Sequence, residues 1–278
     1  MSDNPNIKNF IQPDFVRPEL VEEVTVSEPP LKFQKLTFPG GFSFVTQSGS
    51  KEATLIFNEV VIKQEYFKNG LVLEGARCVM DIGANIGIFT LEVMRQSPDT
   101  VVYSFEAIPD TFQALQQNVL SLGGTGAHVF NVALGAQDHT QMTFTYYPNM
   151  AGNSTASPAL KAQQRQGMDQ IFGQEQTAIF FQSETRLVEV RTLSSIIREQ
   201  GITYVDYLKI DVEGAEVSVL EGIEEAHWPI FKQMGIETHN AALREQVSKI
   251  LVSHGFEVYS DLGISSCFGD AMVYARQP

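Results

Sequence analysis

The sequence is poor in cysteine and in basic residues, and it has no long apolar run. Of its two cysteines, Cys78 opens an apolar strand and is interpreted as a buried free thiol; with Cys267, this usage fits a reducing compartment. Lys and Arg total 19 against 33 Asp and Glu, so the formal net charge is -14. Since sequence-independent binding to phosphate backbones needs cationic side chains, nucleic acid is not expected as a partner.

No apolar run approaches the roughly 18 residues that a membrane-spanning helix requires. The first ten residues, MSDNPNIKNF, lack a basic region followed by an apolar one. We therefore expect a cytoplasmic protein without a membrane partner. Apolar residues make up 43% of the chain and charged residues 19%, which is typical of an ordinary globular protein.

Three parts differ in their patterns. Residues 1–30 show no sustained period and are predicted to be a tail or linker. Residues 31–75 are predicted to form an N-terminal cap, a β-hairpin followed by a helical or mixed segment. Residues 76–278 alternate strand and helix, which indicates an α/β domain with a parallel sheet covered on both faces. Within it, the polar stretch 148–185 has no clear period and is expected to be an insertion that acts as a lid.

The alternation predicts the following elements. Strands are expected at Cys78–Asp81, Val101–Glu106, His128–Leu134, Met142–Tyr147, Leu187–Thr192, Tyr204–Asp211, Met234–Glu237, Phe256–Ser260 and Ala271–Ala275. Helices are expected at Ile88–Arg95, Thr111–Leu122, Leu193–Gln200, Ala215–Glu221 and Ala241–His254, the last with Gly255 as its left-handed cap residue.

The stretch VMDIGANIGIFTLEVM places a glycine turn between the first of these strands and a helix. The dinucleotide fingerprint G-x-G-x-x-G fails here, because counting from Gly83 its other two positions hold Asn85 and Ile88. The pattern is D-x-G-x-N-x-G, with Asp81 at the strand end. A carboxylate there disfavours an anionic pyrophosphate and favours a cationic ligand. Glu106 ends the next strand, where it can accept hydrogen bonds from both ribose hydroxyls.

The succession DIGANIGIFT, FEAIPDTFQALQQNV, NVALG, VRTLSSII and YLKIDVEGAEVSVLEG resembles the FkbM family of S-adenosylmethionine-dependent methyltransferases over about residues 59–275. The resemblance implies a class I (Rossmann-like) methyltransferase fold, with a seven-stranded mostly parallel sheet, and methyl transfer to oxygen. It implies that the cofactor S-adenosylmethionine contacts Asp81, Gly83, Ala84, Asn85, Gly87, Glu106, Ala107, Ile108, Ala133 and Asp211.

Within that set, the resemblance implies separate roles. Asp81 is expected to reach the ammonium side of the cofactor directly or through water, and Glu106 to hold its ribose. Ala107 and Ile108 are expected to flank the adenine. The chain departs from the family at Ser194, where Asp is usual; serine is still expected to cap that helix.

Transfer of a methyl group from a sulfonium to an alcohol needs an aligned acceptor that loses its proton. Candidate groups end two strands: Asp211 and Glu213 in KIDVEG, and Glu237 and His239 in MGIETHN. Three alternatives stay open: His239 as base, Asp211 alone as base, or a divalent metal such as Mg²⁺ held by Asp211 with Glu237 or His239. Glu213 also has a plainer interpretation, as a favourable carboxylate in the first turn of a helix.

We therefore expect an O-methyltransferase that acts on a hydroxyl of a small metabolite, polyketide-type or saccharide. The acceptor could be tethered to a carrier domain, although such domains are acidic and this chain's charge would repel them. Two other classes remain: a nicotinamide-dependent oxidoreductase on the same sheet, and a non-catalytic module that binds S-adenosylmethionine.

Overall fold

The computed structural model describes residues 15–25, 32–50, 52–123, 126–262 and 270–278. The expectations for residues 1–14 and for Cys267 lie outside these ranges. The strands are β1 (Leu20–Thr25), β2 (Lys32–Thr37), β3 (Ser43–Gln47), β4 (Cys78–Ile82), β5 (Val101–Phe105), β6 (Ala127–Phe130), β7 (Ala133–Leu134), β8 (Thr140–Tyr146), β9 (Glu184–Arg191), β10 (Tyr207–Ile210), β11 (Gln233–Thr238), β12 (Glu257–Leu262) and β13 (Ala271–Arg276).

The helices include several short ones. The α-helices are α2 (Glu52–Phe57), α3 (Ile88–Gln96), α4 (Pro109–Ser121), α5 (Lys161–Phe172), α6 (Gln174–Phe180), α7 (Leu193–Gln200), α8 (Glu216–Glu221) and α9 (Ala241–Ser253). The 3-10 helices are η1 (Pro39–Gly41), η3 (Glu65–Phe67), η4 (Ala151–Asn153), η5 (Pro158–Leu160) and η6 (Trp228–Ile230), and η2 (Asn58–Ile62) is a π-helix. None of the described helices is long and apolar enough to cross a membrane.

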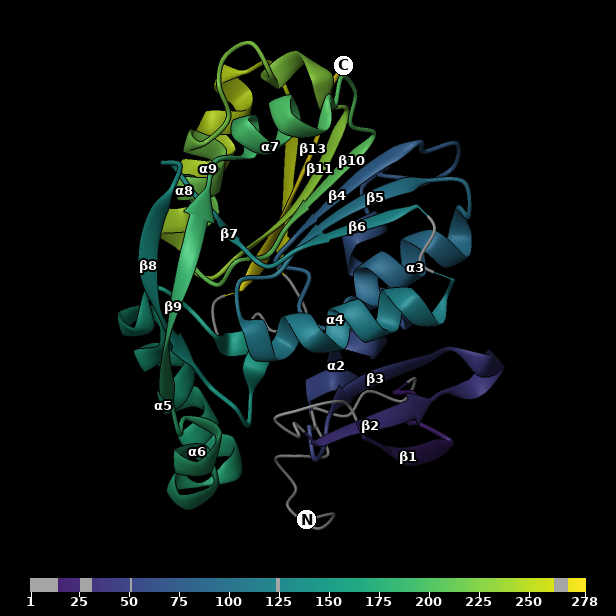
Figure 1. The fold of residues 1–278 in the computed structure, drawn as a ribbon. Helices are drawn as coiled ribbons and strands as arrows, with labels where there is room; N and C mark the ends of the chain where they lie inside the picture. The colour runs from purple at the N-terminus through teal and green to yellow at the C-terminus, as the bar shows by residue number, and fades with distance from the viewer. Residues whose placement is uncertain (1–14, 26–31, 51, 124–125, 263–269) are drawn as a thin grey trace.

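The central sheet has seven strands in the order β12-β13-β11-β10-β4-β5-β6. Its inner strands pair in parallel, and β13 runs antiparallel to both of its neighbours. Helices α3 and α4 lie on one side of the sheet, and α7, α8 and α9 lie on the other (Figure 1). This confirms the predicted class I α/β fold. The inner strands are apolar because both of their faces are covered, so that all four residues of β10 are buried.

The single strand predicted at His128–Leu134 is wrong. The chain forms β6 in the central sheet and then β7 in a second sheet, whose order is β7-β9-β8. The break falls where the Asn131 amide donates hydrogen bonds to the carbonyls of Glu106 and Ala107, at 2.9 and 3.1 Å. An alternation of apolar residues cannot show that a chain changes sheets, because each half satisfies the period.

The predicted tail is wrong for residues 20–25, which form β1. This strand pairs antiparallel with β2, so the predicted hairpin is a three-stranded sheet that packs through β3 against α4. Asn118 of α4 connects the two units. Its amide oxygen accepts from the Val45 N–H at 2.6 Å, and its amide nitrogen donates to the carbonyls of Val45 and Ile86.

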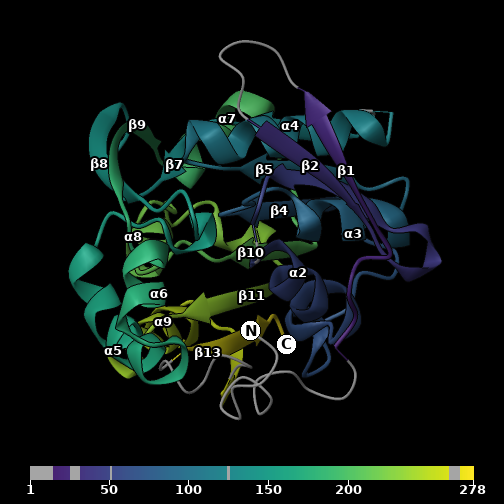
Figure 2. The same ribbon diagram turned by 90° about the horizontal axis from the view of Figure 1, so that it is seen from below.

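The insertion is helical rather than irregular, since it contains α5 and α6. These helices bury few side chains, such as Met168 and Thr177, which explains why the sequence shows no amphipathic period there. Seen from below, α5 and α6 lie on one side of the molecule, and β1, β2 and α2 lie on the other (Figure 2).

The cap of α7 also differs from expectation. Thr192 begins this helix, because its side chain accepts from the Ser195 N–H at 3.1 Å. Ser194 lies one position inside the helix, where its buried hydroxyl accepts from the Glu224 N–H at 2.7 Å.

Candidate active site

A cleft of about 780 Å³ opens at the carboxyl ends of the central strands. Such a volume is typical of sites for small molecules. Residues of the N-terminal segments and of the insertion complete its walls. Of the predicted site residues, it is lined by Gly83, Ala84, Asn85, Glu106, Ala107, Ile108, Ala133, Asp211, Glu213, Glu237 and His239. The topology thus brings Gly83 and His239, which are far apart in the chain, to the wall of one cleft.

The cleft is acidic. Seven carboxylate side chains line it against three side chains of Lys and Arg. The acidic ones are Glu52, Glu59, Glu106, Asp211, Glu213, Glu237 and Asp270. Burial raises the pKa of Glu52 and Glu106 to about 7 and that of Glu59 to about 8, so the wall becomes more negative as pH rises through this range. Negative side chains between low-dielectric walls attract cationic ligands and repel anionic ones.

The glycine turn is shaped by close packing. A Cβ on Gly83 would lie 1.7 Å from the Asp211 carbonyl oxygen, so a side chain there would separate β4 from the chain after β10. Asn85 has a left-handed φ of 52°, which is uncommon for a residue other than glycine. This conformation directs the Asn85 N–H to the carboxylate of Glu106, at 2.8 Å.

Glu106 is held by backbone groups at both oxygens. Oε2 accepts from the Asn85 N–H and Oε1 from the Ile108 N–H, each at 2.8 Å. Burial raises the pKa of Glu106 to about 7, although these two N–H groups lower it. The carboxylate is thus fixed at the end of β5, beside Ala107 and Ile108.

Asp81 does not line the cleft, so its expected reach to the ammonium side of the cofactor stays a prediction, and through water rather than directly. Its side chain is fully buried, and Oδ2 accepts from the Thr90 hydroxyl at 2.7 Å. Lys209 stands between it and the cleft, with its Nζ 3.2 Å from Asp81 Oδ1 and 3.5 Å from Asp211 Oδ2. The Lys209 ammonium also donates to the Gly83 carbonyl at 2.7 Å. Lys209 is thus an ion-pair partner of both carboxylates.

Gly87 is also absent from the cleft wall. It begins α3 with φ 90°, and a Cβ there would lie 2.6 Å from Leu115 Cδ1 in α4. The positive φ favours glycine at this position, and the contact of Gly87 with the cofactor stays a prediction.

Tyr66, which the sequence did not indicate, contacts the carboxylates of Asp211 and Glu237, which with it form the floor of the cleft. Its hydroxyl lies 3.1 Å from Asp211 Oδ2 and 3.0 Å from Glu237 Oε2. A phenol carries one proton, so it can donate to only one of them at a time. Burial, and then the carboxylates of Glu59 and Asp211, raise the pKa of Glu237 well above its ordinary value.

His239 lies between two carboxylates. Its Nδ1 is 3.0 Å from Glu216 Oε1, and its Nε2 is 3.0 Å from Glu213 Oε2. Burial opposes protonation of the ring, but these carboxylates outweigh it and raise the pKa of His239 well above the usual 6.5. With a proton on each nitrogen, the imidazole has no lone pair to accept another one. His239 as the base therefore stays a prediction, and it requires Nε2 to give up its proton first.

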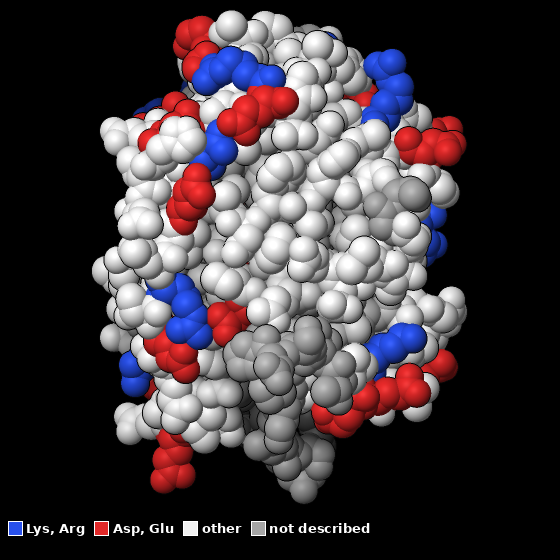
Figure 3. Space-filling view, in the orientation of Figure 1, with Lys and Arg blue, Asp and Glu red and all other residues white. Residues whose placement is uncertain are grey.

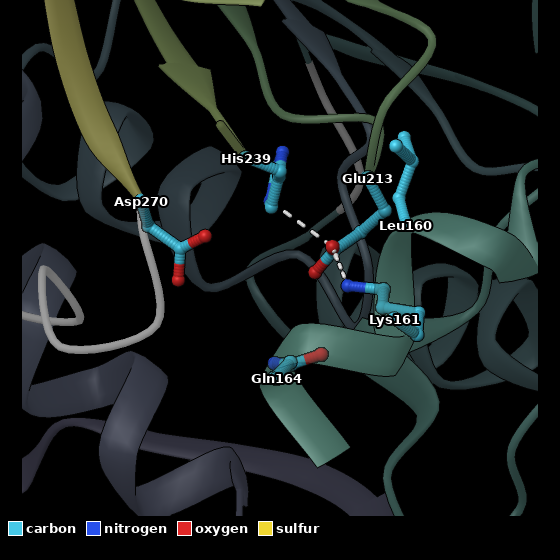
Figure 4. Close-up of a pocket in the computed structure, with 6 residues that line it drawn as sticks. All are labelled: Leu160, Lys161, Gln164, Glu213, His239 and Asp270. Carbon is cyan, nitrogen blue, oxygen red and sulfur yellow. Dashed lines mark hydrogen bonds and ion pairs between the residues drawn. The ribbon is translucent and has the colours of Figure 1, made fainter. Parts of the chain in front are cut away.

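Glu213 is not in the first turn of α8, which begins at Glu216. Its backbone is left-handed, with φ 54°, and its carboxylate pairs with His239 and with Lys161 of α5 (Figure 4). Burial opposes its ionisation, but these two cations lower the pKa of Glu213 to about 2. Thr155 of the insertion donates to the Glu213 carbonyl at 2.6 Å. The insertion is thus attached to the turn after β10.

Three acidic or hydroxyl groups of the N-terminal segments were missed by sequence reasoning. They are Glu52, Glu59 and Tyr66, all of which line the cleft. They belong to a segment predicted only as helical or mixed. Nothing in its local pattern distinguishes residues that face the strand ends from residues that face solvent.

Comparison with known proteins gives a consistent result. Residues 81–258 match the family model described as the methyltransferase FkbM domain. The chain is 31% identical over 242 residues to 31-O-demethyl-FK506 methyltransferase FkbM of Streptomyces tacrolimicus, covering 82% of this chain and 90% of that protein. It is 32% identical over 194 residues to methyltransferase sdnD of Sordaria araneosa, covering 66% and 74%. Methyltransferase 1 of Beauveria bassiana is 30% identical over 228 residues, covering 81% and 90%.

Proposed function

Since this chain belongs to the FkbM family of methyltransferases, we propose that it transfers a methyl group from S-adenosylmethionine to a hydroxyl of a small metabolite. One observation carries the proposal. The expected cofactor residues, apart from Asp81 and Gly87, line the same acidic cleft as Asp211 and Glu237. A cationic nucleoside fits such a wall, whereas a pyrophosphate does not.

The residues present fit this cofactor. Glu106 is fixed by two N–H groups and would accept hydrogen bonds from ribose hydroxyls. Ala107 and Ile108 give an apolar edge beside it for a base. The cofactor supplies an electrophilic methyl group on its sulfonium. Lys209 in β10 and Asp211, which directly follows this strand, would orient the cofactor and acceptor groups that face the carboxyl end of β10.

The acceptor side of the cleft is apolar. Its wall includes Val21 and Leu55 of the N-terminal segments, together with Met168, Phe172 and Phe180 of the insertion. Leu55 and Val21 are each more than half exposed, at 53% and 54%. Apolar side chains at the mouth favour a polyketide-type acceptor over a saccharide, whose hydroxyls would need polar partners.

The proton of the acceptor hydroxyl would pass to the carboxylates at the floor. Asp211 is their more accessible member, since 27% of its side chain is exposed. The Tyr66 hydroxyl lies between Asp211 Oδ2 and Glu237 Oε2, so it would position Asp211 while the other oxygen, Oδ1, takes up the proton. Asp211 is thus proposed as the base ahead of His239.

The partner chemistry follows from the same features. On the face in Figure 3, Lys and Arg side chains lie beside Asp and Glu, without a broad basic area. Together with the net charge of -14, this supports a small-molecule acceptor rather than nucleic acid.

Calorimetry with S-adenosylmethionine and with NAD tests the cofactor assignment. We expect S-adenosylmethionine to bind and NAD to give no heat. Glu106→Gln should weaken S-adenosylmethionine binding by about tenfold or more, because hydrogen bonds to a charged group contribute about 1.5–3 kcal/mol. Glu74→Gln, at an exposed position, is the control and should leave affinity unchanged. Binding of NAD, or unchanged affinity in Glu106→Gln, would contradict the assignment.

A second measurement follows the methyl group. With methyl-labelled cofactor, label should pass to an apolar hydroxylated acceptor and not to the same acceptor with hydrogen in place of the hydroxyl. Transfer to a nitrogen or carbon of the control compound would rule out O-methylation.

A further inference from the structure

Three metal-ligating side chains meet at the ends of β10 and β11, beside the floor of the cleft. Asp211, Glu213 and His239 each offer one ligand atom, and these atoms all lie within 4.8 Å of one another. His239 Nε2 is 3.0 Å from Glu213 Oε2 and 3.9 Å from Asp211 Oδ1. Among the residues that the structure describes, no other set of three or more His, Cys, Asp or Glu side chains has ligand atoms this close together.

The His239 ring is oriented as in a metal site. Glu216 Oε1 lies 3.0 Å from Nδ1, and the Glu216 side chain is itself fully buried. Gly214 donates its N–H to the same oxygen at 2.8 Å, which holds the carboxylate in place. Histidines that bind metals commonly donate their other ring N–H to a carboxylate, because this fixes the tautomer and the ring direction. Nε2 is thereby directed toward Asp211 and Glu213.

Asp270 gives a second and independent observation. It is only 8% exposed, yet its carboxylate has no hydrogen bond or ion pair with any of the described parts of the chain. It precedes β13 and points into the space between His239 and Gln164 (Figure 4). Its carboxylate oxygens are therefore available to a ligand in the small cavity that it lines.

The space in front of these groups suits a single ion. Glu213, His239 and Asp270, together with Lys161 and Gln164, line a small cavity of about 10 Å³. That volume corresponds to about one water-sized particle. Lys161 pairs with Glu213 at its edge, so an ammonium now neutralises a carboxylate that would face the ion.

We infer that a divalent cation binds between Asp211, Glu213 and His239, with Asp270 as a further oxygen ligand. It would displace the Lys161 ammonium from Glu213 and the proton from Nε2 of His239, which is released to solvent. One imidazole nitrogen among carboxylate oxygens favours a first-row cation such as Mn²⁺ over Mg²⁺, which prefers oxygen ligands alone. Binding itself does not depend on the proposed function. The role of the cation does rest on the proposed function, because a cation beside Asp211 would lower the pKa of an acceptor hydroxyl that it contacts.

Calorimetry on the full chain, freed of metal with EDTA, tests the site with MnCl₂ and with MgCl₂. We expect one Mn²⁺ per chain and at least tenfold weaker Mg²⁺. Asp270→Asn and Glu216→Gln should each weaken Mn²⁺ binding by about tenfold to a hundredfold. Lys161→Met should strengthen it. Glu52→Gln is the matched control, a carboxylate of the same cleft whose hydrogen bond goes to the Gly152 N–H, and should leave the affinity unchanged.

Pulsed EPR of the Mn²⁺ complex gives a signature that a merely structural role would not produce. The spectrum should show ¹⁴N coupling from an imidazole, and His239→Gln should abolish it while Glu52→Gln retains it. Circular dichroism identifies variants that fail to fold. If His239→Gln fails to fold, the calorimetry of Asp270→Asn tests the site by itself.

Two results would overturn the inference: no Mn²⁺ binding by the folded wild-type chain, or Mn²⁺ binding that both Asp270→Asn and His239→Gln leave unchanged. Neither measurement uses methyl transfer. Failure of the metal site is therefore distinguishable from failure of the proposed function, which the cofactor titration tests separately.

Discussion

Tyr66 is the residue whose hydroxyl contacts both carboxylates at the floor of the cleft. It comes from η3, a short 3-10 helix that follows Gln64 in the left-handed region, with φ 50°. Tyr207 of β10 donates to the Tyr66 carbonyl, and the Tyr66 ring packs at 5.5 Å from that of Phe89. The phenol is therefore held rigidly, which suits a group that orients a neighbouring carboxylate.

Tyr66→Phe should lower kcat by about tenfold to a hundredfold, because it removes a hydrogen bond to a charged group while leaving the ring packing intact. Steady-state kinetics with labelled cofactor measures the effect. Tyr274→Phe is the matched control: its buried hydroxyl donates to the Glu65 carbonyl at 2.8 Å and does not line the cleft. Equal losses of kcat in the two variants would mean that Tyr66 is structural only.

His239 lies between the end of β11 at Thr238 and Asn240, the cap residue of helix α9, so the start of this helix helps to position a residue of the site. Asn240 is the cap residue at the start of this helix, and its side chain accepts from the Leu243 N–H at 2.8 Å. Its extended backbone, with φ -169°, lets the chain leave β11 and enter the helix directly.

Asn240→Ala should lower the free energy of unfolding by about 1 kcal/mol, because one N–H of the first turn then loses its partner. Urea denaturation followed by circular dichroism measures this change. Asn240→Asp keeps an acceptor oxygen and should retain most of the stability. A loss as large in Asn240→Asp as in Asn240→Ala would show that the cap oxygen is not responsible.

The N-terminal segment and the insertion meet over the glycine turn. Glu52 in the first turn of α2 accepts from the Gly152 N–H at 2.9 Å. Gly152 itself lies close to Asn85, since a Cβ there would be 3.1 Å from the Asn85 amide nitrogen. Two elements far apart in the chain thus cover the expected cofactor site together.

Glu52→Ala should open this contact. We expect faster amide exchange at Gly152 and a KM for S-adenosylmethionine raised about tenfold, since the covering loop loses its anchor. Hydrogen–deuterium exchange and steady-state kinetics report the two effects. Glu52→Gln retains an acceptor oxygen and should behave like the wild type. Unchanged exchange at Gly152 in Glu52→Ala would contradict the proposed anchor.

At the scale of the whole molecule, the acidic cleft links stability to pH. Burial raises the pKa of Glu52 and Glu106 to about 7 and that of Glu59 to about 8, from an ordinary 4.5. Between pH 4.5 and 8 the folded chain therefore binds more protons than the unfolded chain. The stability contributed by these groups is fully present below pH 4.5 and is lost as pH rises through 7 to 8.

The Tm of the ligand-free protein should thus fall from pH 5.5 to pH 8.5, and self-repulsion of a chain with charge -14 acts in the same direction. Thermal unfolding at constant ionic strength measures it. S-adenosylmethionine, a cation, should raise Tm more at pH 8.5 than at pH 5.5. Glu59→Gln should flatten the profile near pH 8, where that group titrates. A Tm that rises with pH would contradict this account.

Much of the central domain could be predicted from the sequence because its signals are local. The apolar runs of β4 and β10, the glycine turn and the Asn240 cap each depend on residues close in the chain. Carboxyl ends of parallel strands share one edge of a sheet, so Glu106, Asp211 and Glu237 could be expected together from the strand pattern alone. These features depend on periodicity and on the conformational preferences of single residues.

Only the tertiary structure decided what each charged side chain contacts. Lys209 separates Asp81 from the cleft, Glu213 and Glu216 enclose His239, and Tyr66 arrives from a segment without a telling pattern. The protonation of a histidine and the accessibility of an aspartate depend on neighbours distant in sequence. The sequence therefore determined which chemical groups the site contains, and folding decided which of them face a ligand, because burial and charge pairing are properties of space rather than of sequence order.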